Sequence, residues 1–250
     1  MVTIEYSWIV LFAVLGLTFG SFGTVLISRV PKGQHIGGRS HCSTCKRTLG
    51  VGDLIPLLSY IFLCGRCRHC HRTIGVMYPC VEGTSSLLFV LALFLEHSIL
   101  PSLLLALSLW LLLLIAVIDL RTRTIHDALN FSFVFFAVAH AVSLGRFQVA
   151  GALLLGGFFA AQWLLSKGRW MGSGDIILGI GIGLLLGSAT HALLCLGLAY
   201  VLGAVVAIFL LTTRRATRKS AVPFGPFLAC AALSVLLFGD QLLSVLMHGR

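Results

Sequence analysis

The stretch PSLLLALSLWLLLLIAVIDL, residues 101–120, decides the fold class of this chain. No charged residue interrupts it before Asp119, and about 20 apolar residues are enough for a helix to cross the hydrocarbon core of a bilayer. An ionisable side chain in such a helix costs about 3 kcal/mol at the bilayer centre and is a candidate for function. We therefore predict a transmembrane helix that carries a functional aspartate at its water edge.

The composition of the whole 250-residue chain is that of a membrane protein. Hydrophobic residues make up 58% of the chain and charged residues 10%, with a mean hydropathy of +1.02, whereas soluble domains have about 25% charged residues. The formal net charge is +10, from 18 basic and 8 acidic residues. In a soluble domain this charge would suggest nucleic-acid binding. Here the basic residues lie between apolar runs, so membrane topology accounts for them and we expect no nucleic-acid partner.

Apolar runs predict an all-α polytopic membrane protein with about eight transmembrane helices. The predicted spans are 7–28, 78–96, 101–120, 128–145, 149–166, 174–188, 190–212 and 222–246. The sixth span is short and rich in glycine, which permits close helix packing in membranes. The residues before the first span carry Glu5 and no Lys or Arg, which is not the pattern of a secretory signal peptide.

The distribution of positive charge predicts the orientation of these helices. Basic residues are concentrated in residues 29–77 and in the turns that follow the third, fifth and seventh spans, and only Arg146 and Arg250 fall on the other face. The positive-inside rule then places 29–77 in the cytoplasm and both termini outside. Asp119, at the end of the third span, and Asp175, in G-S-G-D at the start of the sixth, would lie at similar depth on the cytoplasmic side.

The loop 29–77 contains two C-x2-C pairs, Cys42 with Cys45 and Cys67 with Cys70. Each pair can offer two thiolates to one ion, and four thiolates complete a tetrahedral zinc shell. Such a shell leaves no open position for water, so the site is expected to be structural. A cytoplasmic loop of this size has little core and is not expected to hold disulfides, so a metal would supply stability.

Spacing alone leaves some ligands open. Cys64 also forms a C-x2-C with Cys67, so the second pair could be shifted. Three nearby histidines could replace a thiolate, although we expect them at the surface: His41, His69 and His71. The other cysteines are interpreted as small apolar fillers in or beside the spans: Cys80, Cys195 and Cys230.

The order of several motifs resembles the prepilin peptidase family, the bacterial type IV prepilin leader peptidases that also serve type II secretion. Residues 20–31, GSFGTVLISRVP, are similar to the family's G-S-F-x-N-V-x-I-x-R-x-P motif. The cysteine loop through Glu82 looks like the family's cysteine loop. Residues 118–127, IDLRTRTIHD, and 172–175, GSGD, then resemble its two catalytic motifs.

The resemblance implies a membrane aspartic endopeptidase with Asp119 and Asp175 as its catalytic pair. One ionised carboxyl would accept a proton from the attacking water while the protonated partner donates to the scissile carbonyl. Two neighbouring carboxyls can share one proton because like charges do not readily both ionise. Two alternatives need no catalysis: Asp175 could cap the sixth span, and Asp119 could pair with Arg121 or Arg123.

The resemblance also implies substrates, cofactors and location. The substrates would be prepilins and pseudopilins, cleaved after the glycine that ends a short basic leader, at the cytoplasmic face of the bacterial inner membrane. Many family members also methylate the new amino terminus with S-adenosylmethionine, but no methyl-donor motif is recognisable in this sequence. The implied organisation is a first transmembrane helix at 1–28, a cytoplasmic zinc domain at 29–77 and a protease core at 78–250, with membrane lipid as the other partner.

The chain departs from the family pattern without losing either catalytic acid, so the departures bear on substrate preference and on tuning of the second acid. They are Thr24, Ser43, His126 and Ile177. Among the other acids, we expect Asp127 to cap the fourth span, Glu82 to orient the loop or pair with its arginines, and Asp53 to be a turn residue. The alternative functions are a zinc-binding membrane transporter or scaffold, whose acids would line a path through the spans, and a catalytically degenerate homologue.

Overall fold

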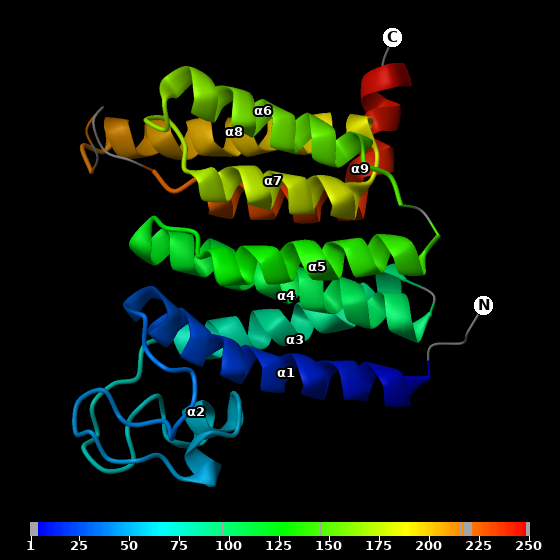
Figure 1. Cartoon of the computed structure of the whole chain (residues 1–250). Coiled ribbons are helices and arrows are strands. Elements are labelled where there is room, and N and C mark those ends of the chain that lie inside the picture. The colour runs from blue at the N-terminus through cyan, green and yellow to red at the C-terminus, as the bar shows by residue number, and fades with distance from the viewer. Residues whose placement is uncertain (1–4, 97, 146, 216, 218–221, 249–250) are drawn as a thin grey trace. The chain divides into compact units, whose positions relative to one another are not determined.

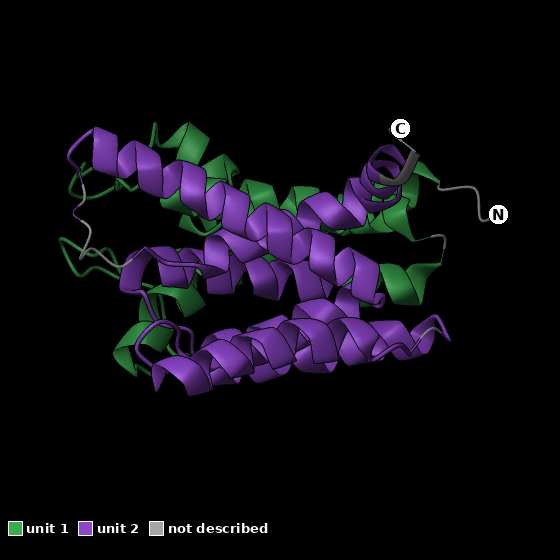
Figure 2. Cartoon of the chain, turned by 90° about the horizontal axis from the view of Figure 1, so that it is seen from above, with its two compact units in different colours: residues 1–106 green, residues 107–250 purple. Residues whose placement is uncertain are grey.

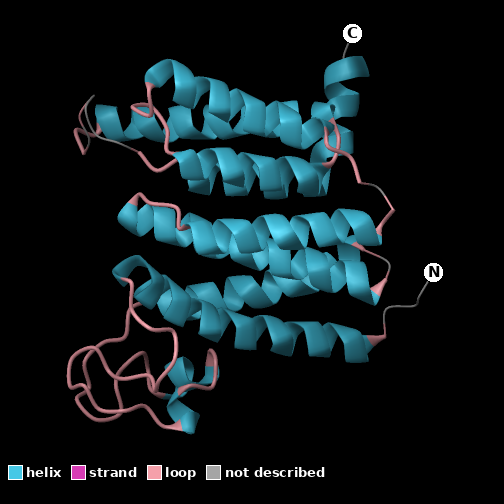
Figure 3. Cartoon of the chain, in the orientation of Figure 1, coloured by secondary structure: helices cyan, strands magenta, loops and turns pink. Residues whose placement is uncertain are grey.

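The computed structural model describes residues 5–96, 98–145, 147–215, 217 and 222–248. The chain divides into two compact units, residues 1–106 and 107–250, with the boundary inside one long helix (Figure 2). The regular structure of the described residues is helical, apart from two isolated bridges in a loop (Figure 3). The predicted all-α class is confirmed.

The long helices of the described residues follow the predicted spans closely. They are α1 (Tyr6–Arg29), α3 (Met77–Leu95), α4 (Ile99–Thr122), α5 (Asp127–Ser143), α6 (Ala150–Ser166), α7 (Ser173–Leu186), α8 (Ala189–Thr212) and α9 (Gly225–His248) (Figure 1). The largest difference is at α9, which begins three residues later than predicted. Pro226 explains the later start, because proline is tolerated in the first turn of a helix and disrupts the interior.

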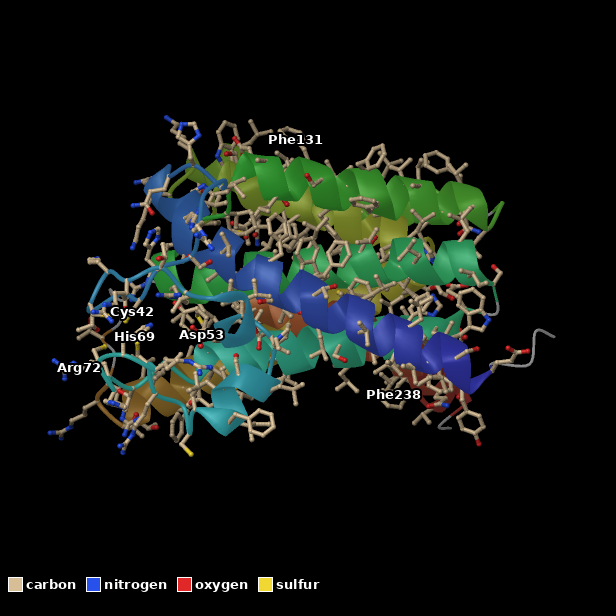
Figure 4. The ribbon with its side chains drawn as sticks, turned by 90° about the horizontal axis from the view of Figure 1, so that it is seen from below. Cys42, Asp53, His69, Arg72, Phe131 and Phe238 are labelled. Atoms are coloured by element: carbon tan, nitrogen blue, oxygen red, sulfur yellow. The ribbon has the colours of Figure 1, made fainter. Side chains whose placement is uncertain are left out.

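Five of these helices are long and apolar enough to cross a membrane, namely α1, α3, α4, α8 and α9, while α5, α6 and α7 are apolar but shorter. Large apolar side chains on the outside fit contact with lipid, and Phe131 on α5 and Phe238 on α9 project away from their helices (Figure 4). Cys195 in α8 is buried, as predicted, whereas Cys80 and Cys230 lie on exposed faces of their helices. The chain is a multi-pass membrane protein.

In unit 1, α1 packs along α3. The two backbones come close at glycines of α1, which have no side chain to separate them. A Cβ at Gly16 would lie 2.5 Å from the Cα of Ser86, and one at Gly20 would lie 2.7 Å from the Cα of Glu82. The hydroxyl of Ser86 also donates to the carbonyl of Ala13 at 3.0 Å. Close approach of small residues is the usual way in which helices associate without a hydrophobic driving force in lipid.

The loop between α1 and α3 holds the short helix α2 (Leu58–Phe62) and two 3-10 turns, Val30–Lys32 and Val51–Asp53. Figure 3 shows that most of this segment is loop. Both C-x2-C pairs lie in it.

In unit 2, α7 packs against α5 and α6, and α8 packs against α6 and α9. Glycines make this packing close: a Cβ at Gly181 would lie 2.6 Å from the ring of Phe133, and one at Gly151 would lie 2.5 Å from the carbonyl oxygen of Gly183. The glycines of the short sixth predicted span therefore bring α7 close to its neighbours.

The helices of unit 2 alternate in direction, so α4, α6 and α8 end where α5, α7 and α9 begin (Figure 1). The described basic residues of unit 2 lie at this end: Arg121, Arg123, Lys167, Arg169, Arg214 and Arg215. Arg146 and Arg250, the two exceptions in the charge pattern, lie outside the described residues.

Candidate functional site

The two C-x2-C pairs in unit 1 fold as matching knuckles. The N–H of Lys46 donates to the carbonyl of Cys42 in the first, and the N–H of His71 donates to the carbonyl of Cys67 in the second, both at 3.0 Å. Lys46 and His71 both have positive φ, 61° and 53°, which closes each turn. Each knuckle is therefore held by its own local hydrogen bonds.

The knuckles bring four thiols together, those of Cys42, Cys45, Cys67 and Cys70, all within 4.8 Å of one another. The Sγ atoms of Cys42 and Cys70 are 3.8 Å apart, and a tetrahedral ion with metal–sulfur bonds of about 2.3 Å has sulfur–sulfur edges of about 3.8 Å. Cys64 is exposed and lies outside the cluster. The second pair of ligands is therefore Cys67 with Cys70, and not Cys64 with Cys67. The three histidines are also outside it and exposed: His41, His69 and His71.

The protonation of the thiols fits a cation site. The backbone N–H groups of Cys45 and Thr44 lower the pKa of the Cys42 thiol to about 6. The N–H of Arg72 donates to Cys70, but desolvation and the neighbouring thiols raise the pKa of Cys70 to about 11. A bound cation favours the thiolate form of the cysteines that coordinate it. The cluster could therefore bind a metal ion.

Side chains connect the two knuckles to the segment between them. Asp53 accepts from the Nε of Arg68 at 2.7 Å and from the N–H of Gly50 at 3.1 Å, and Arg68 lowers the pKa of this carboxyl. His69 of the second knuckle lies 3.3 Å from the guanidinium of Arg47 in the first (Figure 4 labels Asp53 and His69). Asp53 is thus a cross-link within the domain as well as the turn residue that was predicted.

Asp119 lies near the end of α4, with only 5% of its surface exposed. Its Oδ2 accepts the backbone N–H of Gly225, the first residue of α9, at 2.9 Å. The unpaired N–H groups at a helix N-terminus stabilise a negative charge. A Cβ at Gly225 would lie 2.8 Å from the same oxygen, so this approach requires glycine.

Asp175 is the third residue of α7 and does not occupy the cap itself. The N-cap is Gly172, whose N–H donates to the Oδ2 of Asp175 at 3.1 Å. The carboxyl of Asp175 also interacts electrostatically with that of Asp119. The structure of unit 2 therefore brings together the two acids that the motifs singled out.

Two further residues hold the acid pair in place, and sequence reasoning missed both. The first is Gly225. The second is Asn130 on α5, which is fully buried and donates from Nδ2 to the carbonyl of Gly174 at 2.7 Å, directly before Asp175. Its Oδ1 has no hydrogen-bond partner among the described residues. The available signals were an amide within an apolar helix and a glycine in the proline-rich stretch PFGP, residues 223–226.

Two other acids had predicted roles, of which one is confirmed and one is wrong. Glu82 orients the loop, by accepting the N–H of Leu57 at 2.8 Å, and it also forms a hydrogen bond with Ser21. Asp127 is not the cap of its helix, because the N-cap of α5 is His126 and Asp127 is the first helical residue. The partner of Glu82 and the cap of α5 both depend on the path of the chain through a loop or short connection.

The chemistry available to the two sites differs. In unit 2, two nearby carboxyls are each fixed by one backbone N–H, an arrangement that can share a proton and act as general acid and general base. In unit 1, four thiols can surround one ion completely, an arrangement that holds structure and leaves no open coordination position.

Comparisons with known proteins agree with the motifs. Residues 14–95 match the family model of the bacterial peptidase A24 N-terminal domain, and residues 105–208 match that of the type IV leader peptidase family. The prepilin leader peptidase/N-methyltransferase of Bacillus subtilis is 31% identical over 238 residues, which cover 92% of this chain and 94% of the relative. The proteins of the same name from Aeromonas hydrophila and Pseudomonas putida are 34% and 30% identical, over 82% and 94% of this chain and 73% and 92% of the relatives. No solved structure matches the chain significantly. The chain belongs to the type IV leader peptidase family, as its motifs predicted.

Proposed function

We propose that this chain is a prepilin leader peptidase in which Asp119 and Asp175 are the catalytic pair. The observation that supports the pair best is that two acids from different helices lie at the same end of unit 2, each with its Oδ2 held by one backbone N–H. The alternative of a transporter predicts acids strung along a path through the spans. Two acids gathered at one end of the unit favour hydrolysis.

The reaction needs one ionised and one protonated carboxyl. The ionised carboxyl accepts a proton from water as the water oxygen attacks the carbonyl of the glycine that ends the leader. The protonated carboxyl donates to the carbonyl oxygen, and a proton then passes to the leaving amine as the peptide bond breaks. Backbone N–H groups of Gly225 and Gly172 each hold the Oδ2 of one acid, which within the described residues leaves Oδ1 of each acid for water or substrate.

The pair is tested by cleavage of a prepilin in membranes that contain Asp119→Asn or Asp175→Asn enzyme. Each variant keeps the shape of the side chain and removes its ability to exchange a proton, so we expect cleavage to fall at least 1,000-fold, within the range for loss of a residue that acts as part of a catalytic unit. Asp127→Asn is the matched control, because it removes a carboxyl from the same motif outside the pair. Substantial cleavage by either variant of the pair would refute the assignment.

We also propose that the chain methylates the new amino terminus. The names of the relatives include this activity, and S-adenosylmethionine would supply the methyl group, with loss of a proton from the amine. The mass of the mature product tests this: a gain of one methyl group is expected. An Asp119→Asn enzyme that receives a pre-cleaved peptide should still methylate it, which separates the second activity from the first.

The same proposal includes the topology predicted from charge. All eight long helices would cross the bacterial inner membrane, with residues 29–77 as a cytoplasmic zinc domain, residues 78–250 as the protease core and both termini outside. The gathering of basic residues at one end of unit 2 supports this orientation. Alkaline phosphatase fused after residue 250 should be active and the same enzyme fused within 29–77 inactive, and the reverse result would overturn the orientation.

We propose zinc as the ion of the thiol cluster, because four thiolates at tetrahedral spacing are the ligand set of structural zinc. Metal analysis of the purified chain should find about one zinc per chain. A content well below that value would contradict the site.

A further inference from the structure

The segment between the two knuckles, residues 51–62 (VGDLIPLLSYIF), is apolar and exposed. Val51 and Phe62 are each 82% exposed and Ile61 is 65% exposed. Other exposed apolar side chains of the segment are Leu54, Ile55 and Leu58. A contiguous set of this kind marks a surface that contacts another apolar phase.

The segment carries no uncompensated charge. Its single acid, Asp53, is paired with Arg68 at 2.7 Å. The rest of the loop 29–77 is strongly basic, with eight Lys and Arg residues. An apolar segment within a basic domain has the composition of a membrane-surface element, because basic residues are attracted to anionic headgroups while apolar side chains enter the acyl boundary.

A contact with α3, which is itself bonded to α1, places this segment inside the ends of those two helices. Glu82, which accepts the N–H of Leu57, lies five residues into α3, or about 8 Å along its axis. Ser21, which bonds to Glu82, lies eight residues before the end of α1 at Arg29, or about 12 Å along that axis. Both helices are long enough to span a membrane, so the segment is held one to two turns inside the ends of two spans.

The backbone turns sharply at this anchor. Leu57 has φ 58° and ψ −48°, a conformation that is rare for a side chain of this size, and the N–H of Leu58 donates back to the carbonyl of Pro56 at 2.6 Å. A strained turn persists only where its surroundings hold it, and here the carboxylate of Glu82 does so. After the turn, α2 runs across the direction of α1 beside the end of α1 (Figures 1 and 4).

We propose that residues 51–62 form an interfacial element that inserts its apolar side chains into the leaflet at which α1 ends and α3 begins. The occupant of this surface is the headgroup and acyl boundary of the bilayer, which interfacial helices enter to a depth of about 5–10 Å. The position of Glu82, about 8 Å inside the start of α3, lies within that depth, and Glu82 holds the segment at Leu57. The thiol cluster is thereby fixed at the membrane surface, and this attachment does not depend on the peptidase reaction.

The test is photo-crosslinking of the full chain in lipid nanodiscs that contain anionic phospholipid. Benzoylphenylalanine replaces Phe62 in one sample and Arg72 in the control, since the Arg72 side chain is also exposed but points away from the helices (Figure 4). We expect lipid adducts, detected by mass spectrometry, to be at least ten-fold more abundant at position 62. Equal lipid yields, or adducts at position 62 mainly to a second copy or to another part of the chain, would overturn the proposal.

A second variant tests the anchor. Glu82→Ala removes the acceptor for the N–H of Leu57, so the lipid adduct at position 62 should fall several-fold, whereas Glu82→Gln keeps an acceptor oxygen and should retain most of it. Size-exclusion chromatography shows whether each variant is folded and monodisperse. Lipid adducts that are unchanged in a folded Glu82→Ala variant would contradict the role of this anchor.

Discussion

Gly225→Ala should reduce cleavage strongly while it leaves the fold intact. The residue begins α9, and its N–H donates to the Oδ2 of Asp119 at 2.9 Å. An added Cβ would lie 2.8 Å from the same oxygen and 3.4 Å from the Cβ and Cγ of Asp119. Ordinary contact begins near 3.4 Å, so the carboxylate has to move by about 0.6 Å, away from its hydrogen-bond donor.

The size of the effect follows from that displacement. A misplacement of 1 Å in a catalytic group costs about 100-fold in rate, so a movement of about 0.6 Å predicts a loss of about 10-fold. If the hydrogen bond to the carboxylate is also lost, the loss reaches about 100-fold, because a hydrogen bond to a charged group contributes about 1.5–3 kcal/mol. Alanine is a better helix former than glycine by about 1 kcal/mol, so α9 itself should not be weakened.

The assay is the initial rate of prepilin cleavage in membranes, with the thermal unfolding midpoint of each purified variant measured in detergent. Gly157→Ala is the matched control, because a Cβ at Gly157 in α6 meets nothing within 4 Å. We expect the control to cleave at the wild-type rate. Wild-type cleavage by Gly225→Ala, alongside an inactive Asp119→Asn enzyme, would refute the view that this contact positions Asp119.

The remaining predictions concern supports farther from the acids. Asn130→Leu keeps the branched shape of the side chain but leaves the buried carbonyl of Gly174 without its donor, a cost of about 1–3 kcal/mol. We expect kcat to fall more than KM rises, and an unchanged kcat would exclude a positioning role. Gly183→Ala places a Cβ against the backbone of Gly151, so it should destabilise the α6–α7 contact by about 1–3 kcal/mol, measured as a lower unfolding midpoint. Cys67→Ser, or treatment with a strong chelator, should release the metal and make residues 29–77 sensitive to protease; undiminished resistance would show that the loop is stable without the ion.

Local features of the chain could be predicted well. The bounds of the helices follow from hydropathy, because a backbone in lipid has to satisfy its hydrogen bonds within its own helix, whatever its neighbours are. The knuckles are also local, since Cys42 and Cys67 each make their backbone hydrogen bonds within a few residues. The start of α9 and the cap of α5 were the exceptions, and both depend on the detailed path of a short connection.

The sequence by itself determined that this is an all-helical membrane protein of the leader peptidase family, with two candidate acids and a four-cysteine loop. Only the tertiary structure decided what holds those parts in place. Asp119 is joined to Gly225, 106 residues away, Asn130 supports the turn before Asp175, and Glu82 holds the strained turn at Leu57. These contacts join segments that are distant along the chain, and no periodicity or spacing encodes a hydrogen bond that forms only after the helices have packed.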